Sequence, residues 1–223
     1  LFLHFFLTII NYHYHEINFI SKIERILDFY KIFIKNHFLP LEIFHIFKKN
    51  KRILLYFFEN GIISMDRYMI KTILVGKYFT SKYLQYFYPE IKPFINEKWF
   101  QKYGKENWEF IRSYLLERVI KELPEKFYEK RKIGENDNEI CRFIQKDLIE
   151  EFIIYVNKND YSIKSTINSS IYETNPILLN KEEITLIEYA AFYGSIQIYQ
   201  YLRLNNANLN PKIWLYAIHG NNP

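Results

Sequence analysis

A helix-start motif followed by a glycine constrains the fold of this chain more than any other feature. In the stretch Thr185–Glu188 (TLIE), the threonine hydroxyl and the glutamate carboxylate can each accept a hydrogen bond from the other residue's backbone N–H group. This reciprocal capping box predicts that a helix begins directly after Thr185. Gly194 is predicted to end the helix, because glycine adopts the left-handed conformation of a helix C-terminal cap without strain.

A second short helix is predicted directly after this glycine. Ser195 stands at its start, and Ile198, Tyr201 and Leu202 follow at the i, i+3, i+4 spacing of one apolar helix face. Asn206 is predicted to end it, since asparagine also tolerates the left-handed conformation. Two short helices joined at a glycine form a helical hairpin, which cannot bury its apolar faces alone, so neighbouring hairpins are expected.

Alanine is confined to this part of the chain. The four alanines of the sequence are Ala190, Ala191, Ala207 and Ala217. Small side chains at a helix contact reduce the distance between two packed helices. Adjacent alanines on the first helix are therefore expected to let a neighbouring hairpin approach closely.

The hairpin resembles the ankyrin repeat, in which T-P-L-H-x-A-A-x-x-G is followed by a second helix and a G-A-D-x-N turn. Ten residues match this pattern in register: Thr185, Ile187, Ala190, Ala191, Gly194, Ile196, Ile198, Leu202, Ala207 and Asn210. Three positions depart from it, with Leu186 in place of proline, Glu188 in place of histidine and Asn206 in place of glycine. The resemblance implies a solenoid of helix-turn-helix repeats that binds protein partners without a cofactor.

Weaker copies of the pattern lie on both sides of this hairpin. Downstream, Ile213, Ala217 and Gly220 repeat the spacing of Ile187, Ala191 and Gly194; upstream, Ile140, Ile144, Asp147 and Asn159 stand at the offsets of Ile187, Ala191, Gly194 and Asn206. The predicted helix pair Pro40–Gly61 fits more loosely. Taken whole, the chain resembles divergent ankyrin-repeat proteins expanded in certain protists, which join a helical N-terminal region to recognisable repeats.

The expected fold is all-α, an ankyrin-like α-solenoid of helix-turn-helix repeats that degenerates towards the N-terminus. We expect a divergent helical region over residues 1–135 and an ankyrin-repeat region over residues 136–223. The chain begins with Leu1 and ends before the second helix of its last repeat, so a fragment truncated at the C-terminus is expected.

Composition agrees with a helical chain. The sequence has 6 glycines and 7 prolines among 223 residues, fewer than the many turns of a β-sandwich or barrel require. The single cysteine, Cys141, excludes an intrachain disulfide and suits a reducing, intracellular and cytoplasmic setting. The apolar stretch Leu1–Ile10 is too short to span a membrane, and is interpreted as a truncated buried helix, with a targeting segment as the alternative.

Charge gives a second, weaker indication. The net charge is +5, and the segment Lys121–Asn138 contains the basic residues Lys126, Lys130, Arg131 and Lys132, interrupted by Glu125 and Glu129. This segment is expected to be an exposed face of mixed charge. The alternative is an electrostatic binder of nucleic acid or of an anionic membrane surface.

No constellation of residues in the sequence supports catalysis. Phosphate-binding glycine loops and the G-x-S-x-G nucleophile elbow are absent from the sequence. His13 and His15 stand two residues apart, which on a helix directs them away from one another, so no metal site is expected. Cys141 stands beside Ile140 at an inward-facing spacing and is interpreted as a packed thiol rather than a nucleophile.

The preferred interpretation is therefore a non-catalytic protein-interaction module with an unidentified protein partner and no cofactor. The candidate contact residues occupy positions that face outward in the repeat: Tyr189, Phe192 and Tyr193 on the first helix, Asn208 and Asn210 at the turn, and His219 at the place of Tyr193 in the next repeat. Large aromatic side chains at such positions would anchor a partner. The alternative is that Phe192 and Tyr193 cover the next hairpin instead.

Overall fold

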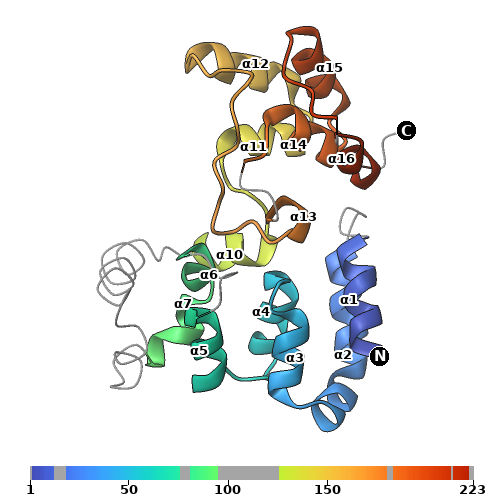
Figure 1. The fold of residues 1–223 in the computed structure, drawn as a ribbon, viewed down its shortest axis with the longest axis vertical. Helices are drawn as coiled ribbons and strands as arrows, with labels where there is room; N and C mark the ends of the chain where they lie inside the picture. Colours follow the sequence, from blue (N-terminus) through green and yellow to red (C-terminus); the bar gives the residue numbers. More distant parts are fainter. Residues whose placement is uncertain are drawn as a thin grey trace. The chain divides into compact units, whose positions relative to one another are not determined.

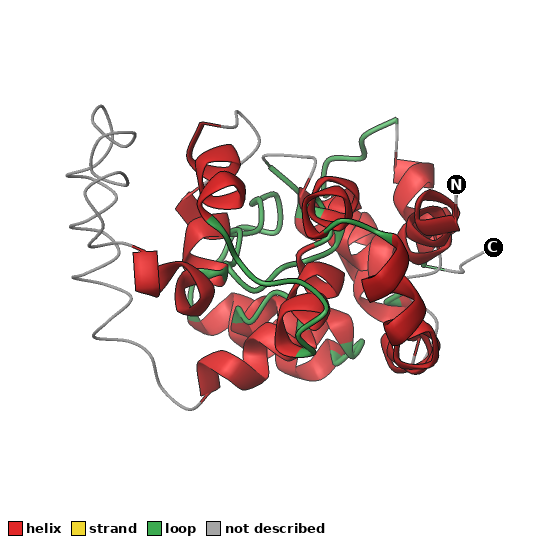
Figure 2. Ribbon diagram, turned by 90° about the horizontal axis from the view of Figure 1, so that it is seen from below, coloured by secondary structure: helices red, strands yellow, loops and turns green. Residues whose placement is uncertain are grey.

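The computed structural model describes residues 2–12, 19–75, 81–94, 126–179, 183–211 and 213–220. These residues form helices and irregular connections, and their one bridge between extended segments joins Thr166 to Thr185 (Figures 1 and 2). The predicted all-α class is confirmed. His13 and His15 lie outside the described residues.

Contacts divide the chain into two compact units. The first contains Leu1–Leu7 and Ser21–Glu135, and the second contains Thr8–Ile20 and Asn136–Pro223. Up to residue 135 the helices are α1 Phe2–Tyr12, α2 Phe19–His37, α3 Pro40–Phe47, α4 Lys51–Glu59, α5 Arg67–Val75, α6 Ser81–Tyr86, α7 Tyr88–Ile91, the 3-10 helix η1 Lys92–Phe94 and α10 Lys126–Ile133.

The predicted helix pair Pro40–Gly61 is present as α3 and α4. Pro40 occupies the first turn of α3, where its missing N–H group would have no intrahelical acceptor. The Asn50 side chain accepts a hydrogen bond from the Ile53 N–H group at 3.1 Å and so caps the start of α4. Gly61 follows α4 with φ at 60°, the left-handed conformation common after a helix.

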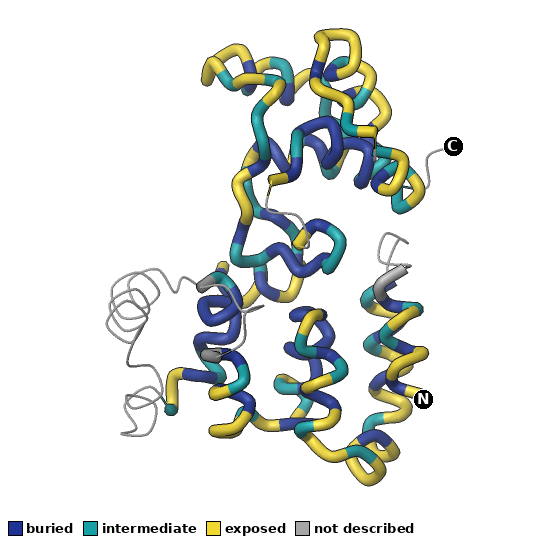
Figure 3. Tube along the Cα trace, viewed as in Figure 1, coloured by how far each residue is buried: buried dark blue, intermediate teal, exposed yellow. Residues whose placement is uncertain are grey.

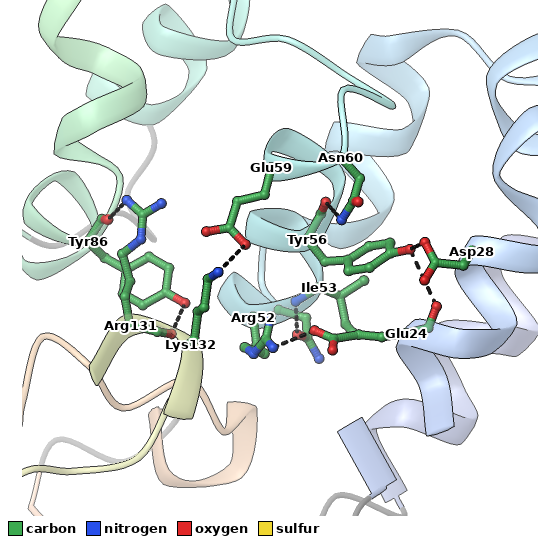
Figure 4. Close-up of polar contacts among 11 residues, drawn as sticks. Glu24, Asp28, Arg52, Ile53, Tyr56, Glu59, Asn60, Tyr86, Arg131 and Lys132 are labelled. Carbon is green, nitrogen blue, oxygen red and sulfur yellow. Dashed lines mark hydrogen bonds and ion pairs between the residues drawn. The ribbon is translucent and has the colours of Figure 1, made fainter. Parts of the chain in front are cut away.

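Helix α4 is fixed to α2 by polar contacts (Figure 4). Arg52 forms an ion pair with Glu24, and the Tyr56 hydroxyl donates a hydrogen bond to Asp28. Both acidic side chains of α2 are therefore directed at α4. Burial and, to a smaller extent, the adjacent carboxylates raise the pKa of Tyr56 well above its usual value. This hydroxyl therefore keeps its proton.

Helix α10 departs at Arg131 from the expectation of an exposed face of mixed charge. Arg131 is only 1% exposed, and its guanidinium donates to both carboxylate oxygens of Glu90 at 2.6 and 3.0 Å. It also donates to the Tyr86 carbonyl at 2.9 Å, while the Tyr86 hydroxyl donates to the Arg131 carbonyl at 2.9 Å (Figure 4). Lys132 lies 3.8 Å from Glu59. Phe127 and Arg131 are the buried residues of α10, so the arginine anchors this helix together with one apolar side chain.

Beyond residue 135 the helices are α11 Glu139–Gln145, α12 Ile149–Lys158, α13 Pro176–Leu179, α14 Leu186–Tyr193, α15 Ile196–Leu204 and α16 Ile213–His219. They form successive hairpins: α11 pairs with α12, and α14 pairs with α15. The first helices contact one another, α11 with α14 and α14 with α16, and the second helix α12 contacts α15 (Figure 1). The unit therefore has two layers of helices.

The two complete hairpins turn at equivalent residues. Asp147 follows α11 with φ at 51°, and Gly194 follows α14 with φ at 69°, as their alignment in the sequence predicts. At the other end Asn206 is left-handed with φ at 61°, but its counterpart is Asp160, at 47°, rather than Asn159. The predicted position is wrong by one residue because α12 has 10 residues and α15 has 9.

Candidate protein-interaction surface

The predicted start and end of α14 are confirmed. The Thr185 hydroxyl accepts a hydrogen bond from the Glu188 N–H group at 3.3 Å, and the Glu188 carboxylate accepts one from the Thr185 N–H group at 3.0 Å. Gly194 donates its N–H group to the Ala190 and Ala191 carbonyls and ends the helix. Glu188 is the one charged residue of α14, and this cap uses its carboxylate.

Helix α14 is buried on every side (Figure 3). Its residues from Leu186 to Phe192 are all buried, because α11, α15 and α16 contact it. A helix that is apolar around its whole circumference is normally a core helix, so this burial fits its composition. α14 is therefore the centre of the second unit rather than its surface.

Gly220, which follows α16, lies close to the backbone at the end of α14. A Cβ atom added at Gly220 would lie 2.4 Å from the Ala191 carbonyl oxygen and 2.9 Å from the Gly194 backbone nitrogen. Real Cβ atoms essentially never come this close to other heavy atoms. A side chain at position 220 would therefore separate the end of α16 from the end of α14.

The structure corrects the expectation that Tyr189 faces outward. Tyr189 is 1% exposed, and its hydroxyl accepts a hydrogen bond from the Gln145 side chain of α11 at 2.9 Å. Burial, with the nearby Glu173 carboxylate and Cys141, raises the pKa of Tyr189 far above its usual value. Tyr189 therefore links the hairpin of α14 and α15 to the hairpin of α11 and α12 through a buried side chain.

Phe192 is also in the core, and the alternative that it covers the next hairpin is confirmed. Its side chain has no exposed surface, and its ring centroid lies 6.0 Å from that of His219 on α16. The neighbouring Tyr193 is half-buried, with its ring 5.2 Å from that of Phe192. The sequence pattern placed these aromatics on an open face because it did not show that α16 packs there.

The other three candidate residues remain accessible. Asn208 is exposed, and Asn210 is half-buried, with its carbonyl accepting the Ile213 N–H group at 2.9 Å before α16. His219 is half-buried, and burial lowers the pKa of its imidazole below the usual value. Together with Tyr193, these residues lie in the segment from α14 to the end of α16.

The candidate list missed the exposed apolar side chains of α16 and the turn before it. Leu209 is 51% exposed, Trp214 is 55% exposed and Ile218 is 64% exposed. Trp214 and Ile218 stand four residues apart on one helix and so share a face. Trp214 is among only 3 tryptophans in the chain, and tryptophan is enriched at protein contact sites, so it was a usable sequence signal.

Adjacent hairpins are also joined through Asp147. Its carboxylate accepts the Gln197 N–H group at 3.1 Å and the Ile198 N–H group at 3.0 Å. These N–H groups belong to the first turn of α15, where no intrahelical acceptor exists. The residue that ends α11 therefore caps the second helix of the following hairpin.

We expect Asp147→Gly to lower the free energy of unfolding by about 1 kcal/mol, because glycine keeps the left-handed turn but removes both cross-hairpin hydrogen bonds. Asp160→Gly is the matched control, since Asp160 is left-handed too but caps no helix, and it should be neutral or slightly stabilising. Urea unfolding followed by circular dichroism measures both. Equal effects of the two substitutions would show that the Asp147 cap contributes nothing.

Cys141 is a packed thiol rather than an accessible nucleophile. It has no exposed surface, and burial, with the Glu173 and Asp137 carboxylates, raises its pKa to about 12. A cavity of about 30 Å³, which Cys141 does not line, is lined in part by Asn136, Glu173 and Tyr189. This volume is enough for a water molecule but not for a substrate.

Among the described residues, no three histidine, cysteine, aspartate or glutamate side chains are grouped as a metal site would need. None of the helices in the described ranges combines the length and the apolar composition needed to cross a bilayer. The chain matches no family model, no curated protein and no solved structure.

Proposed function

We propose that residues 136–220 form an ankyrin-like solenoid that binds another protein, without catalysis and without a cofactor. The observation that carries this proposal is the repetition of the hairpin: Asp147 and Gly194 turn two hairpins at equivalent positions, and Asp147 then caps the second helix of the next one. Repeats of this kind stack through nearest-neighbour contacts and use an extended surface for binding.

The partner surface that the geometry favours is the turn before α16 together with the outer face of that helix. Leu209, Trp214 and Ile218 are exposed there, and Asn208 adds an accessible amide. A central apolar anchor with polar groups at its edge is the usual composition of a protein contact. Tyr189 and Phe192 have no part in this surface, and act by holding α14 in place.

Site-specific photo-crosslinking tests the proposal. A photoreactive amino acid is introduced in the full chain at Leu209 or Trp214, and at Leu204 on α15, which is 81% exposed, as the control. The proposal predicts one discrete protein adduct from positions 209 and 214 in cells that produce the chain, and none from position 204. Equal labelling at all three positions, or no protein adduct, would contradict it.

The observations favour this function over nucleic-acid binding through the basic segment. Arg131 is buried against Glu90, and Lys132 lies beside Glu59, so two of the four basic residues of α10 are used within the chain. We also propose an intracellular, cytoplasmic location, because Cys141 is a buried thiol without a disulfide partner.

A further inference from the structure

Helix α2 has two apolar faces, of which the chain covers one. Ile23, Leu27 and Ile34 form the inner face and are 3%, 1% and 0% exposed. On the other side Phe29 is 82% exposed and Ile32 is 75% exposed. A surface helix normally has a polar outer face, so these side chains require an explanation.

Aromatic residues of α1 and α2 extend this outer face into a ridge. The Phe2 ring lies 5.6 Å from the Tyr30 ring and 6.5 Å from the Phe33 ring, and these three side chains are 39–45% exposed. Phe5, in the same helix as Phe2, is 66% exposed. Exposed apolar groups that lie together in this way mark a site of interaction rather than isolated surface residues.

The charges that accompany the ridge are mainly basic. The two carboxylates of α2 are directed at α4, since Glu24 pairs with Arg52 and Asp28 accepts from Tyr56. The exposed charged residues of α2 are Lys22, Arg25, Lys35 and Asp28 itself, which remains exposed beside its contact with Tyr56. Basic residues therefore outnumber acidic ones, three to one, among the exposed charged residues of this helix.

We propose that α2, with the adjoining aromatic residues of α1, binds an anionic membrane surface. A helix with apolar side chains on its outer face and lysine or arginine beside them lies in the plane of a lipid interface, with its apolar groups below the headgroups. The basic residues complement anionic headgroups, and each adds to the attraction. This binding is peripheral. It uses a part of the chain different from the proposed protein-binding surface, which is formed by the turn before α16 and the outer face of α16.

Vesicle co-sedimentation of the full chain tests this inference, with phosphatidylcholine vesicles that either contain or lack phosphatidylserine. We expect binding only to the anionic vesicles. Phe29→Ser/Ile32→Ser and Lys22→Glu/Arg25→Glu should each weaken it at least about tenfold. Arg203→Glu/Leu204→Ser removes an equally exposed apolar side chain and a basic charge from α15, and should leave binding unchanged.

Circular dichroism must show the same helix content for all of these chains, which is expected because every replaced side chain is exposed. Absence of binding to anionic vesicles, equal binding to both kinds of vesicle, or binding that survives both α2 variants would overturn the inference. Light scattering adds one more outcome: a dimer that Phe29→Ser/Ile32→Ser converts to a monomer would show that a second copy of the chain covers this face, and would overturn it too.

Discussion

Phe192→Ala is expected to lower the free energy of unfolding of the second unit by about 3–5 kcal/mol. Phe192 belongs to α14 and has no exposed surface, and its ring lies against the ring of His219 on α16. Truncation to alanine removes most of its buried apolar area and leaves a cavity that α16 cannot fill without moving. A smaller apolar replacement, Phe192→Leu, should have a smaller effect.

Urea unfolding followed by circular dichroism measures this loss. Leu204→Ala on α15 is the control, because Leu204 is 81% exposed and its truncation should change stability by no more than about 0.5 kcal/mol. If Phe192→Ala lowered the free energy of unfolding as little as Leu204→Ala, Phe192 would be a surface residue. The prediction that Phe192 faces outward in the repeat would then hold.

Arg131→Met is expected to destabilise the first unit by about 3–5 kcal/mol, because it leaves the Glu90 carboxylate without its cation in a site largely removed from water. The Glu90 side chain is 16% exposed and the Arg131 side chain 2%. The same substitution also removes the hydrogen bond to the Tyr86 carbonyl. The link between α10 and the helices α6 and α7 should therefore be lost first.

Two further variants separate this ion pair from general effects of substitution. Arg131→Met/Glu90→Leu should recover much of the lost stability, since no unpaired charge remains. Lys132 is the partner of Glu59, and the Lys132 side chain is 57% exposed. Lys132→Met should therefore lower the free energy of unfolding by less than about 1 kcal/mol. A double variant as unstable as Arg131→Met, or a Lys132→Met variant equally unstable, would contradict the assignment of Arg131 as the anchor of α10.

Local features of the fold could be predicted from the sequence because their causes are local. The capping box at Thr185 and Glu188 and the left-handed turns at Gly194 and Asn206 depend on residues within one helical turn. The same holds for Asp147, whose place at the end of α11 follows from its alignment with Gly194. The all-α class follows from many such signals together.

The burial of Tyr189 and Phe192 could have been predicted from composition but not from repeat position. The stretch Leu186–Tyr193 is apolar around the helix apart from Glu188, and that carboxylate is used by the cap. Such a helix requires neighbours on all sides. The repeat pattern instead treats these positions as an open face, which holds only where no following helix covers them.

Long-range polar contacts had no sequence signal. Arg131 is one basic residue among several, and its burial depends on Glu90, which precedes it by 41 residues. Asp147 caps α15 across 50 residues of chain to Gln197, and nothing in its own neighbourhood indicates this acceptor role. Pairings of this kind are set by how the helices pack, so they emerge only in the folded structure.

Amide hydrogen exchange at Gln197 and Ile198 tests the stacking of successive hairpins most directly. Both N–H groups belong to the first turn of α15, where a lone helix offers no acceptor, and both donate to Asp147 of the preceding hairpin. If the hairpins stack, these two amides exchange slowly in the full chain, and Asp147→Gly accelerates both while α15 stays helical. Rapid exchange of both amides in the unaltered chain would show that the hairpins do not stack in this way.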